Sequence, residues 1–134
     1  MARALVVDDS RSMRSILGRV LAGLGVQVSE AGNGREALEA LEAGPLPDVV
    51  LVDWNMPEMN GIELVGIIHR RPEWRAMSVM MVTTESAPEQ IARALLAGAH
   101  EYLIKPFTAD GLASKLELLG VALGAPAASG CAQC

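Results

Sequence analysis

Short apolar runs of strand length alternate five times with longer segments whose apolar residues recur at the period of a helix. Runs without polar interruption are typical of strands buried on both faces, and connections long enough to form helices allow neighbouring strands to run parallel. The sequence therefore predicts five βα units in a three-layer α/β domain. The expected strands lie at residues 5–7, 26–28, 49–53, 79–83 and 102–104, and the expected helices at 13–24, 35–43, 62–69, 91–96 and 111–123.

The first expected helix shows the pattern most clearly. Ser10 has the side chain that an N-cap favours, and apolar residues then recur three and four positions apart from Met13 to Leu24. Gly25 follows as a stop signal, and Gly44-Pro45 and Gly98 play the same part after later helices. These signals separate each helix from the strand that comes after it.

Length and composition exclude several classes of protein. A chain of 134 residues that is 51% hydrophobic suits one domain, expected over residues 1–123, and the small-residue-rich segment 124–134 is expected to be a flexible tail. A net charge of -5 argues against a nucleic-acid or anionic-membrane partner. The first apolar run is too short for a signal peptide or a membrane span, so we expect a cytoplasmic protein.

The two histidines are assigned no chemistry, and for the two cysteines we favour a tail without function over a tail disulfide or metal clip. Cys131 and Cys134 have C-x-x-C spacing, but both lie in the expected tail without a second pair of zinc ligands. His69 and His100 have no ligand spacing around them, so we interpret both as ordinary surface or packing residues.

Polar residues instead gather where the expected strands end. Asp8 and Asp9 follow the first strand, Asp53 ends the third, Thr83 ends the fourth, and Lys105 lies just past the fifth. Because the carboxyl ends of parallel strands meet at one edge of a sheet, where open α/β folds place their sites, we expect these side chains to lie close together.

This predicted cluster requires a cation and suggests a chemistry. Two carboxylates 4 Å apart repel by roughly 4 kcal/mol at an effective dielectric of about 20, and Lys105 alone cannot offset three of them. Mg²⁺ takes carboxylate and carbonyl oxygens while leaving positions open for a phosphoryl group. We therefore predict Mg²⁺, with Asp53 as the nucleophile toward phosphorus and with Thr83 and Lys105 binding the phosphoryl oxygens.

Four sequence blocks resemble the receiver domain of two-component response regulators, specifically the single-domain, CheY-like chemotaxis regulators. The likeness extends over roughly residues 3–119 and implies a flavodoxin-like fold whose five parallel strands have the order 2-1-3-4-5. The blocks are VVDDS at 6–10, VDWNMPEMNG at 52–61, MVT at 81–83 and YLIKPFT at 102–108.

The resemblance also implies roles for these residues. Asp53 would accept a phosphoryl group from the phosphohistidine of a histidine kinase. Asp9, Asp53 and the backbone carbonyl of Asn55 would ligate Mg²⁺, with Asp8 acting mainly through a bound water, and Thr83 and Lys105 would hold the phosphoryl oxygens.

The family's switch is expected as well. A shift of Thr83 toward the phosphoryl group would let Tyr102 turn inward and remodel the face formed by the fourth helix, fifth strand and fifth helix. The Lys105-Pro106 bond would be cis, and Asn55 and Glu85 would modulate the lifetime of the phosphoryl group, toward the short, chemotaxis-like side.

The output partner is left open by the sequence. Ala87-Pro88 stands where motor-binding relatives usually carry basic residues, and this departure argues against binding to the flagellar motor switch. The expected partner is therefore that switch or another protein. We expect a monomer that controls chemotaxis or motility, and an intermediate carrier in a phosphorelay is the alternative.

Two further functions share this kind of sheet. A Mg²⁺-dependent phosphatase with an aspartate nucleophile would resemble the haloacid-dehalogenase-like enzymes, which carry a second aspartate where this chain has Asn55. An FMN carrier would need a Gly-rich phosphate loop, which the sequence lacks after its first strand. We therefore predict a signalling switch, not an enzyme, whose chemistry is its own phosphorylation and dephosphorylation.

Overall fold

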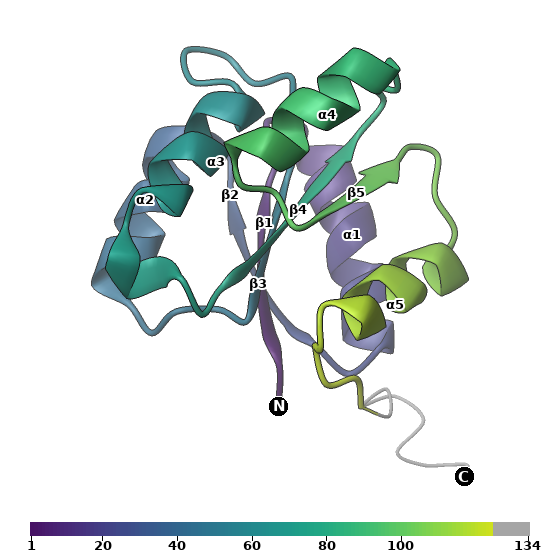
Figure 1. Ribbon diagram of the computed structural model, residues 1–134. Helices are drawn as coiled ribbons and strands as arrows, with labels where there is room; N and C mark the ends of the chain where they lie inside the picture. Colours follow the sequence, from purple (N-terminus) through teal and green to yellow (C-terminus); the bar gives the residue numbers. More distant parts are fainter. Residues whose placement is uncertain (125–134) are drawn as a thin grey trace, which may run out of the picture.

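A computed structural model describes residues 1–124 as a parallel sheet covered by helices on both faces (Figure 1). This is the predicted three-layer α/β architecture. The elements are β1 (Arg3–Val7), α1 (Arg11–Gly23), β2 (Gln27–Ala31), α2 (Gly34–Ala43), β3 (Val49–Val52), α3 (Gly61–His69), the short 3₁₀ helix η1 (Pro72–Trp74), β4 (Ser78–Thr83), α4 (Pro88–Ala97), β5 (Glu101–Ile104) and α5 (Ala109–Leu118).

The five strands are all parallel and lie in the order β2-β1-β3-β4-β5. This order confirms the flavodoxin-like topology. The chain leaves β1, moves to the edge at β2, and returns across β1 to β3 before it continues to β5 at the opposite edge. The reversal places the carboxyl ends of β1 and β3 side by side, which is where a ligand site is expected in such a sheet.

The hydrophobic core forms two clusters, one on each face of the sheet. Leu5 and Val7 of β1 point to the face covered by α2, α3 and α4, whereas Ala4 and Val6 point to the face covered by α1 and α5. All four residues of β3 are buried. The uninterrupted apolar runs in the sequence thus reflect strands that have no solvent-exposed side.

Side-chain caps fix where the helices begin. Ser10, Asn33 and Thr108 each accept a hydrogen bond from a backbone amide in the first turn of the helix that follows. Asn60 and Glu63 form a reciprocal capping box at the start of α3. The N-cap predicted at Ser10 is therefore confirmed, and each cap sets the direction in which the chain leaves the carboxyl edge of the sheet.

The structure corrects several predicted boundaries. The second strand runs over Gln27–Ala31 and not 26–28, because an edge strand tolerates polar residues such as Ser29 and Glu30. The last helix ends at Leu118 and not at 123, because Gly120 adopts a left-handed backbone conformation with φ +78°. The η1 turn was not predicted.

Two X-Pro peptide bonds are in the cis form. The Lys105-Pro106 bond is cis, as the resemblance implied, and the Gly44-Pro45 bond is also cis, which was not predicted. The expected tail, apart from Gly124, lies outside the described residues together with Cys131 and Cys134. Among residues 1–124, no helix has the length and apolar character to cross a membrane.

Gly61 should be far less tolerant of a side chain than Gly66 in the same helix. A Cβ at Gly61 would overlap the backbone carbonyl oxygen of Asp53, whereas one at Gly66 would come within 3.4 Å only of the flexible end of Arg70. We expect Gly61→Ala to lower the free energy of unfolding by about 2 kcal/mol, and Gly66→Ala to raise it by about 0.5–1 kcal/mol. Urea denaturation of both variants tests this, and equal effects would contradict it.

Candidate functional site

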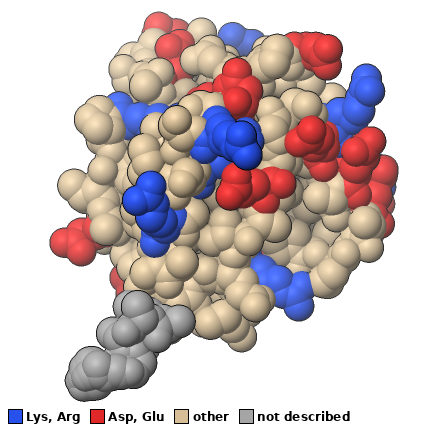
Figure 2. Space-filling model, turned by 180° about the vertical axis from the view of Figure 1, so that it is seen from behind, with Lys and Arg blue, Asp and Glu red and all other residues tan. Residues whose placement is uncertain are grey.

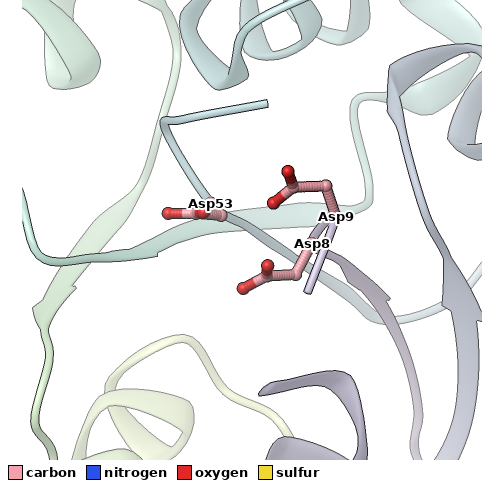
Figure 3. Close-up of side chains that lie close together, drawn as sticks. All are labelled: Asp8, Asp9 and Asp53. Carbon is pink, nitrogen blue, oxygen red and sulfur yellow. The ribbon is translucent and has the colours of Figure 1, made fainter. Parts of the chain in front are cut away.

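Three carboxylates meet at the carboxyl edge of the sheet. Asp8, Asp9 and Asp53 each offer an oxygen atom, and these atoms all lie within 4.8 Å of one another. Figure 3 shows the three side chains projecting from the ends of two neighbouring strand segments. The structure therefore brings Asp53 next to Asp8 and Asp9, although more than forty positions separate it from them in the sequence.

The sheet ladder positions these residues beyond the ends of the strands. The Asp53 amide donates to the Val7 carbonyl at 3.0 Å, and the Asp8 amide donates to the Ala31 carbonyl at 3.2 Å. On the other side of the site, the Lys105 amide donates to the Thr83 carbonyl at 2.8 Å. Backbone hydrogen bonds thus continue past the strands and hold the site residues on a rigid base.

Lys105 bridges two of the carboxylates. Its Nζ lies 3.0 Å from Asp8 Oδ2 and 3.8 Å from Asp53 Oδ1. The Lys105 side chain is 11% exposed and that of Asp8 only 2%, so this ion pair is shielded from solvent. Asp8 Oδ1 also accepts the Ser10 amide hydrogen at 2.9 Å. Asp8 is therefore fully engaged, and Asp9 is the exposed member of the cluster.

Burial raises the pKa of the Asp53 carboxyl above its ordinary value of 3.8. The positive charge of Lys105 acts in the opposite direction, while the negative charge of Asp8 adds to the increase in pKa. Interactions with the Thr83 hydroxyl and the Trp54 backbone lower the pKa by smaller amounts. Desolvation and like-charge repulsion outweigh these attractions, so the net shift of the Asp53 pKa is upward.

We expect Asp53 to reduce the stability of the metal-free protein at neutral pH. A carboxyl whose pKa is higher in the folded than in the unfolded state weakens folding as the pH rises above 3.8, and the penalty persists at pH 7. Asp53→Asn should therefore raise the free energy of unfolding at pH 7 by about 1 kcal/mol, and the gain should shrink near pH 4. Urea denaturation with a chelator at both pH values measures the gain, and a less stable variant at pH 7 would contradict it.

The donor set fits Mg²⁺. It consists of carboxylate oxygens from three residues that lie within 4.8 Å of one another, and Mg²⁺ is bound through carboxylates while it retains several waters. Asn55, whose backbone carbonyl was predicted as a further ligand, is an exposed residue of the loop after β3. A divalent cation would also relieve the repulsion that raises the pKa of Asp53.

The predicted switch residues lie next to this site. Thr83 is fully buried at the end of β4, and its hydroxyl accepts the Glu85 amide hydrogen at 3.3 Å. Tyr102 is also buried, and its hydroxyl donates to the Glu85 carbonyl at 2.7 Å. The structure thus connects Thr83 and Tyr102 through hydrogen bonds to the backbone of Glu85, and the Tyr102 side chain is buried before any shift of Thr83.

Two arginines at the site were missed in the sequence. Arg14 of α1 donates to the Asp8 carbonyl, and Arg93 of α4 lies over the Trp54 ring at 5.9 Å from its centroid. Neither has a motif that distinguishes it from the other arginines of the chain. A signal for Arg14 was available, because helix side chains lean toward the N-terminus and Arg14 lies one turn after the Ser10 cap.

The surface has no dominant sign of charge on the face shown in Figure 2. Basic and acidic side chains are interspersed there over a largely uncharged surface.

The exposed apolar residues of α4, β5 and α5 belong to the face that was expected to change on switching. They are Leu95, Leu96, Ile104 and Leu118, which are 46%, 86%, 41% and 72% exposed.

Comparison with known proteins gives a consistent result. The family model of the response regulator receiver domain matches residues 4–117. Chemotaxis protein CheY1 of Helicobacter pylori is 42% identical over 118 residues, which cover 87% of this chain and 95% of that protein. The chemotaxis protein CheY homolog of Campylobacter jejuni is 44% identical over 128 residues, with coverages of 94% and 98%.

Solved structures agree with this relationship. Vibrio cholerae chemotaxis protein CheY4 matches with a TM-score of 0.82 at 35% identity, covering 89% of this chain and 98% of that chain. The Thermotoga maritima response regulator protein TrrA, solved in complex with Mg²⁺-BeF, matches with a TM-score of 0.79 at 33% identity, covering 89% and 99%. The fold, the family match and these relatives together show that the chain belongs to the response regulator receiver domain family, among its CheY-like members.

Proposed function

We propose that the protein is a phospho-acceptor response regulator that is phosphorylated on Asp53 and uses Mg²⁺. The observation that carries this proposal is the position of Asp53 at the carboxyl edge of the sheet, where its carboxylate lies 3.8 Å from the Lys105 ammonium group and within 4.8 Å of the Asp8 and Asp9 carboxylates. A carboxylate in that position can act as a nucleophile while neighbouring groups bind the group that it attacks.

The proposed reaction is a phosphoryl transfer from a histidine kinase. An Asp53 carboxylate oxygen attacks the phosphorus of phosphohistidine, a new O–P bond forms, and the N–P bond breaks. The electron pair of that bond stays on the departing imidazole nitrogen of the kinase. Hydrolysis of the resulting acyl phosphate by water then releases inorganic phosphate and regenerates Asp53.

Different residues of the chain would bind the metal, bind the phosphoryl oxygens and control the access of water. Asp9, Asp53 and the Asn55 carbonyl would hold Mg²⁺, with Asp8 acting through water, and the ion would supply positive charge to the phosphoryl oxygens. Lys105 would bind one phosphoryl oxygen through its ammonium group, and the Thr83 hydroxyl would donate to another. Asn55 and Glu85, which are exposed and partly exposed, would control how water reaches the phosphoryl group.

The output would be a change of surface. Thr83 moves toward the phosphoryl group, and the unit that it forms with Glu85 and Tyr102 transmits this shift to α4 and β5. Phosphorylation can bias the two states only by the difference in its interaction with each of them. The exposed apolar residues of α4, β5 and α5 would then present an altered face to a protein partner.

The relatives suggest the pathway that this switch serves. Both curated relatives described above are chemotaxis proteins, so we propose control of chemotaxis or motility by a cytoplasmic monomer. The flagellar motor switch or another protein would be the partner. α4 begins with Pro88 after an Ala87 N-cap that provides no side-chain hydrogen bond and no positive charge. The start of α4 therefore differs from that of motor-binding relatives, which usually carry basic residues there.

Removal of the metal tests the proposal directly. With Mg²⁺ and acetyl phosphate or phosphoramidate, intact-mass spectrometry should show the addition of one phosphoryl group. A chelator should reduce the labelling rate at least about 100-fold, because positive charge at the phosphoryl oxygens is a large part of such catalysis. Titration with Mg²⁺ alone should also change the emission of Trp54, which follows Asp53. Labelling that is equally fast with the chelator would overturn the metal requirement.

A further inference from the structure

Arg14 joins three segments of the chain at the edge of the acidic site. Its Nη1 donates to the Asp8 backbone carbonyl at 2.6 Å, and its Nε donates to Glu30 Oε1 at 3.0 Å. The Arg14 side chain is only 17% exposed although it belongs to a helix surface. A Cβ at Gly32 would come within 3.4 Å of Nη1, which shows how closely the chain after β2 approaches the guanidinium group.

The contact with Asp8 acts on the backbone that carries Asp9. The Asp8 carbonyl and the Asp9 amide belong to one planar peptide unit, so a bond that fixes the carbonyl also fixes the direction in which Asp9 leaves the strand. Asp8 itself is held through its side chain by Lys105 at 3.0 Å and by the Ser10 amide at 2.9 Å. The hydrogen bond from Arg14 to the Asp8 carbonyl therefore holds the peptide unit that joins Asp8 to Asp9.

The geometry requires an arginine. Nε and Nη1 of one planar guanidinium point to different partners, Glu30 on β2 and Asp8 after β1. A lysine has a single ammonium group on a flexible stem and would not hold both partners in a fixed plane. Glu30 is 46% exposed, so we interpret its role as fixing the orientation of the guanidinium and not as a buried ion pair.

We propose that Arg14 is a positioning residue for the magnesium and phosphorylation site, acting through the Asp8 carbonyl on the orientation of the Asp9 carboxylate. This inference rests on the function proposed above. The side-chain hydrogen bonds of Arg14 go to Glu30 and to the Asp8 carbonyl, so we assign Arg14 no direct contact with the ion or the phosphoryl group. It determines how well the exposed Asp9 oxygen is placed before Mg²⁺ arrives, so it should affect the affinity for the metal more than the transfer step itself.

The test separates these two effects. Isothermal titration calorimetry with MgCl₂ should show a dissociation constant about tenfold higher for Arg14→Ala than for the wild type, because residues that orient metal ligands contribute 10–100-fold in affinity. At saturating Mg²⁺, the labelling rate with phosphoramidate should stay within about twofold of the wild type. An unchanged dissociation constant in a folded Arg14→Ala variant would overturn the proposal.

Three matched variants keep the test decisive. Arg19→Ala removes an exposed arginine from the same helix and should leave Mg²⁺ affinity unchanged. Glu30→Gln keeps an acceptor for Nε and should stay near the wild type. Arg14→Lys should give an intermediate affinity, and it serves as the test if the alanine variant does not fold. A Lys variant with wild-type affinity would show that charge alone matters and would overturn the positioning role.

Failure of this inference is distinguishable from failure of the proposed function. If the wild type binds no Mg²⁺ and takes up no phosphoryl group, the proposed function is wrong. If the wild type does both and Arg14→Ala changes only the midpoint of urea unfolding, the proposed function stands. Arg14 is then a purely structural residue, and the inference is wrong.

Discussion

Asp53→Asn should abolish the uptake of a phosphoryl group from acetyl phosphate or phosphoramidate. The amide nitrogen and oxygen of asparagine are too weakly nucleophilic to attack phosphorus, and among residues 1–124 the carboxylates clustered with Asp53 are those of Asp8 and Asp9, which are assigned to the metal. Because the isosteric amide keeps the shape of the side chain, the variant should still fold. Intact-mass spectrometry and peptide mapping measure the result.

Asp110→Asn is the matched control for that experiment. Asp110 is an exposed aspartate in the first turn of α5, away from the three carboxylates of the site. Its replacement should leave labelling unchanged. Undiminished labelling of Asp53→Asn would show that the phosphoryl group goes to another residue, and the proposed function would have to be abandoned.

Lys105→Met should lower both stability and phosphorylation. The substitution leaves the Asp8 carboxylate, which is 2% exposed, without its charged partner at 3.0 Å. Removal of one partner from a buried ion pair typically costs about 3–5 kcal/mol in unfolding free energy. Phosphorylation at saturating Mg²⁺ should fall by about 100-fold, because one fixed donor to a phosphoryl oxygen is lost.

Lys115→Met provides a comparison on the protein surface. Lys115 pairs with Glu101 at 2.8 Å, but its side chain is 34% exposed, so its loss should cost less than about 1 kcal/mol and leave labelling intact. Adding Asp8→Asn to Lys105→Met should restore part of the lost stability, since the unpaired charge is removed. Urea denaturation measures all three variants, and equal costs for the two lysines would contradict the buried ion pair.

Much of the fold could be predicted from two sequence patterns. Continuous apolar runs indicate strands that are buried on both faces, and apolar residues at the helical period indicate helices that are buried on one face. The runs at 49–52 and 79–82 are apolar throughout because β3 and β4 have helices on both faces. The edge strand β2 was placed too early, because its outer residues are polar and the alternation is weak. Helix ends depend on single backbone conformations such as that of Gly120, which a hydrophobic pattern does not encode.

The site could be predicted in outline because parallel topology alone brings strand ends together. That rule predicts that the side chains of Asp8, Asp9 and Asp53 lie close together, and their separation of at most 4.8 Å confirms it. Contacts made through the backbone were not accessible in the same way. The bond from Tyr102 to the Glu85 carbonyl depends on a main-chain position, which has no signature in residue type. For the bond from Arg14 to the Asp8 carbonyl, the available signal was the place of Arg14 one turn after the Ser10 cap.

The polar character of β2 has a further consequence for how the protein behaves in a crowded solution. Its unpaired edge is a template to which a strand of a second molecule could add, and such addition is how ordered aggregates begin. Gln27, Ser29 and Glu30 are the more exposed residues of this strand, and a charge on an edge strand discourages that association. We therefore expect Glu30 to discourage self-assembly through this edge, in addition to pairing with Arg14 beside the acidic site.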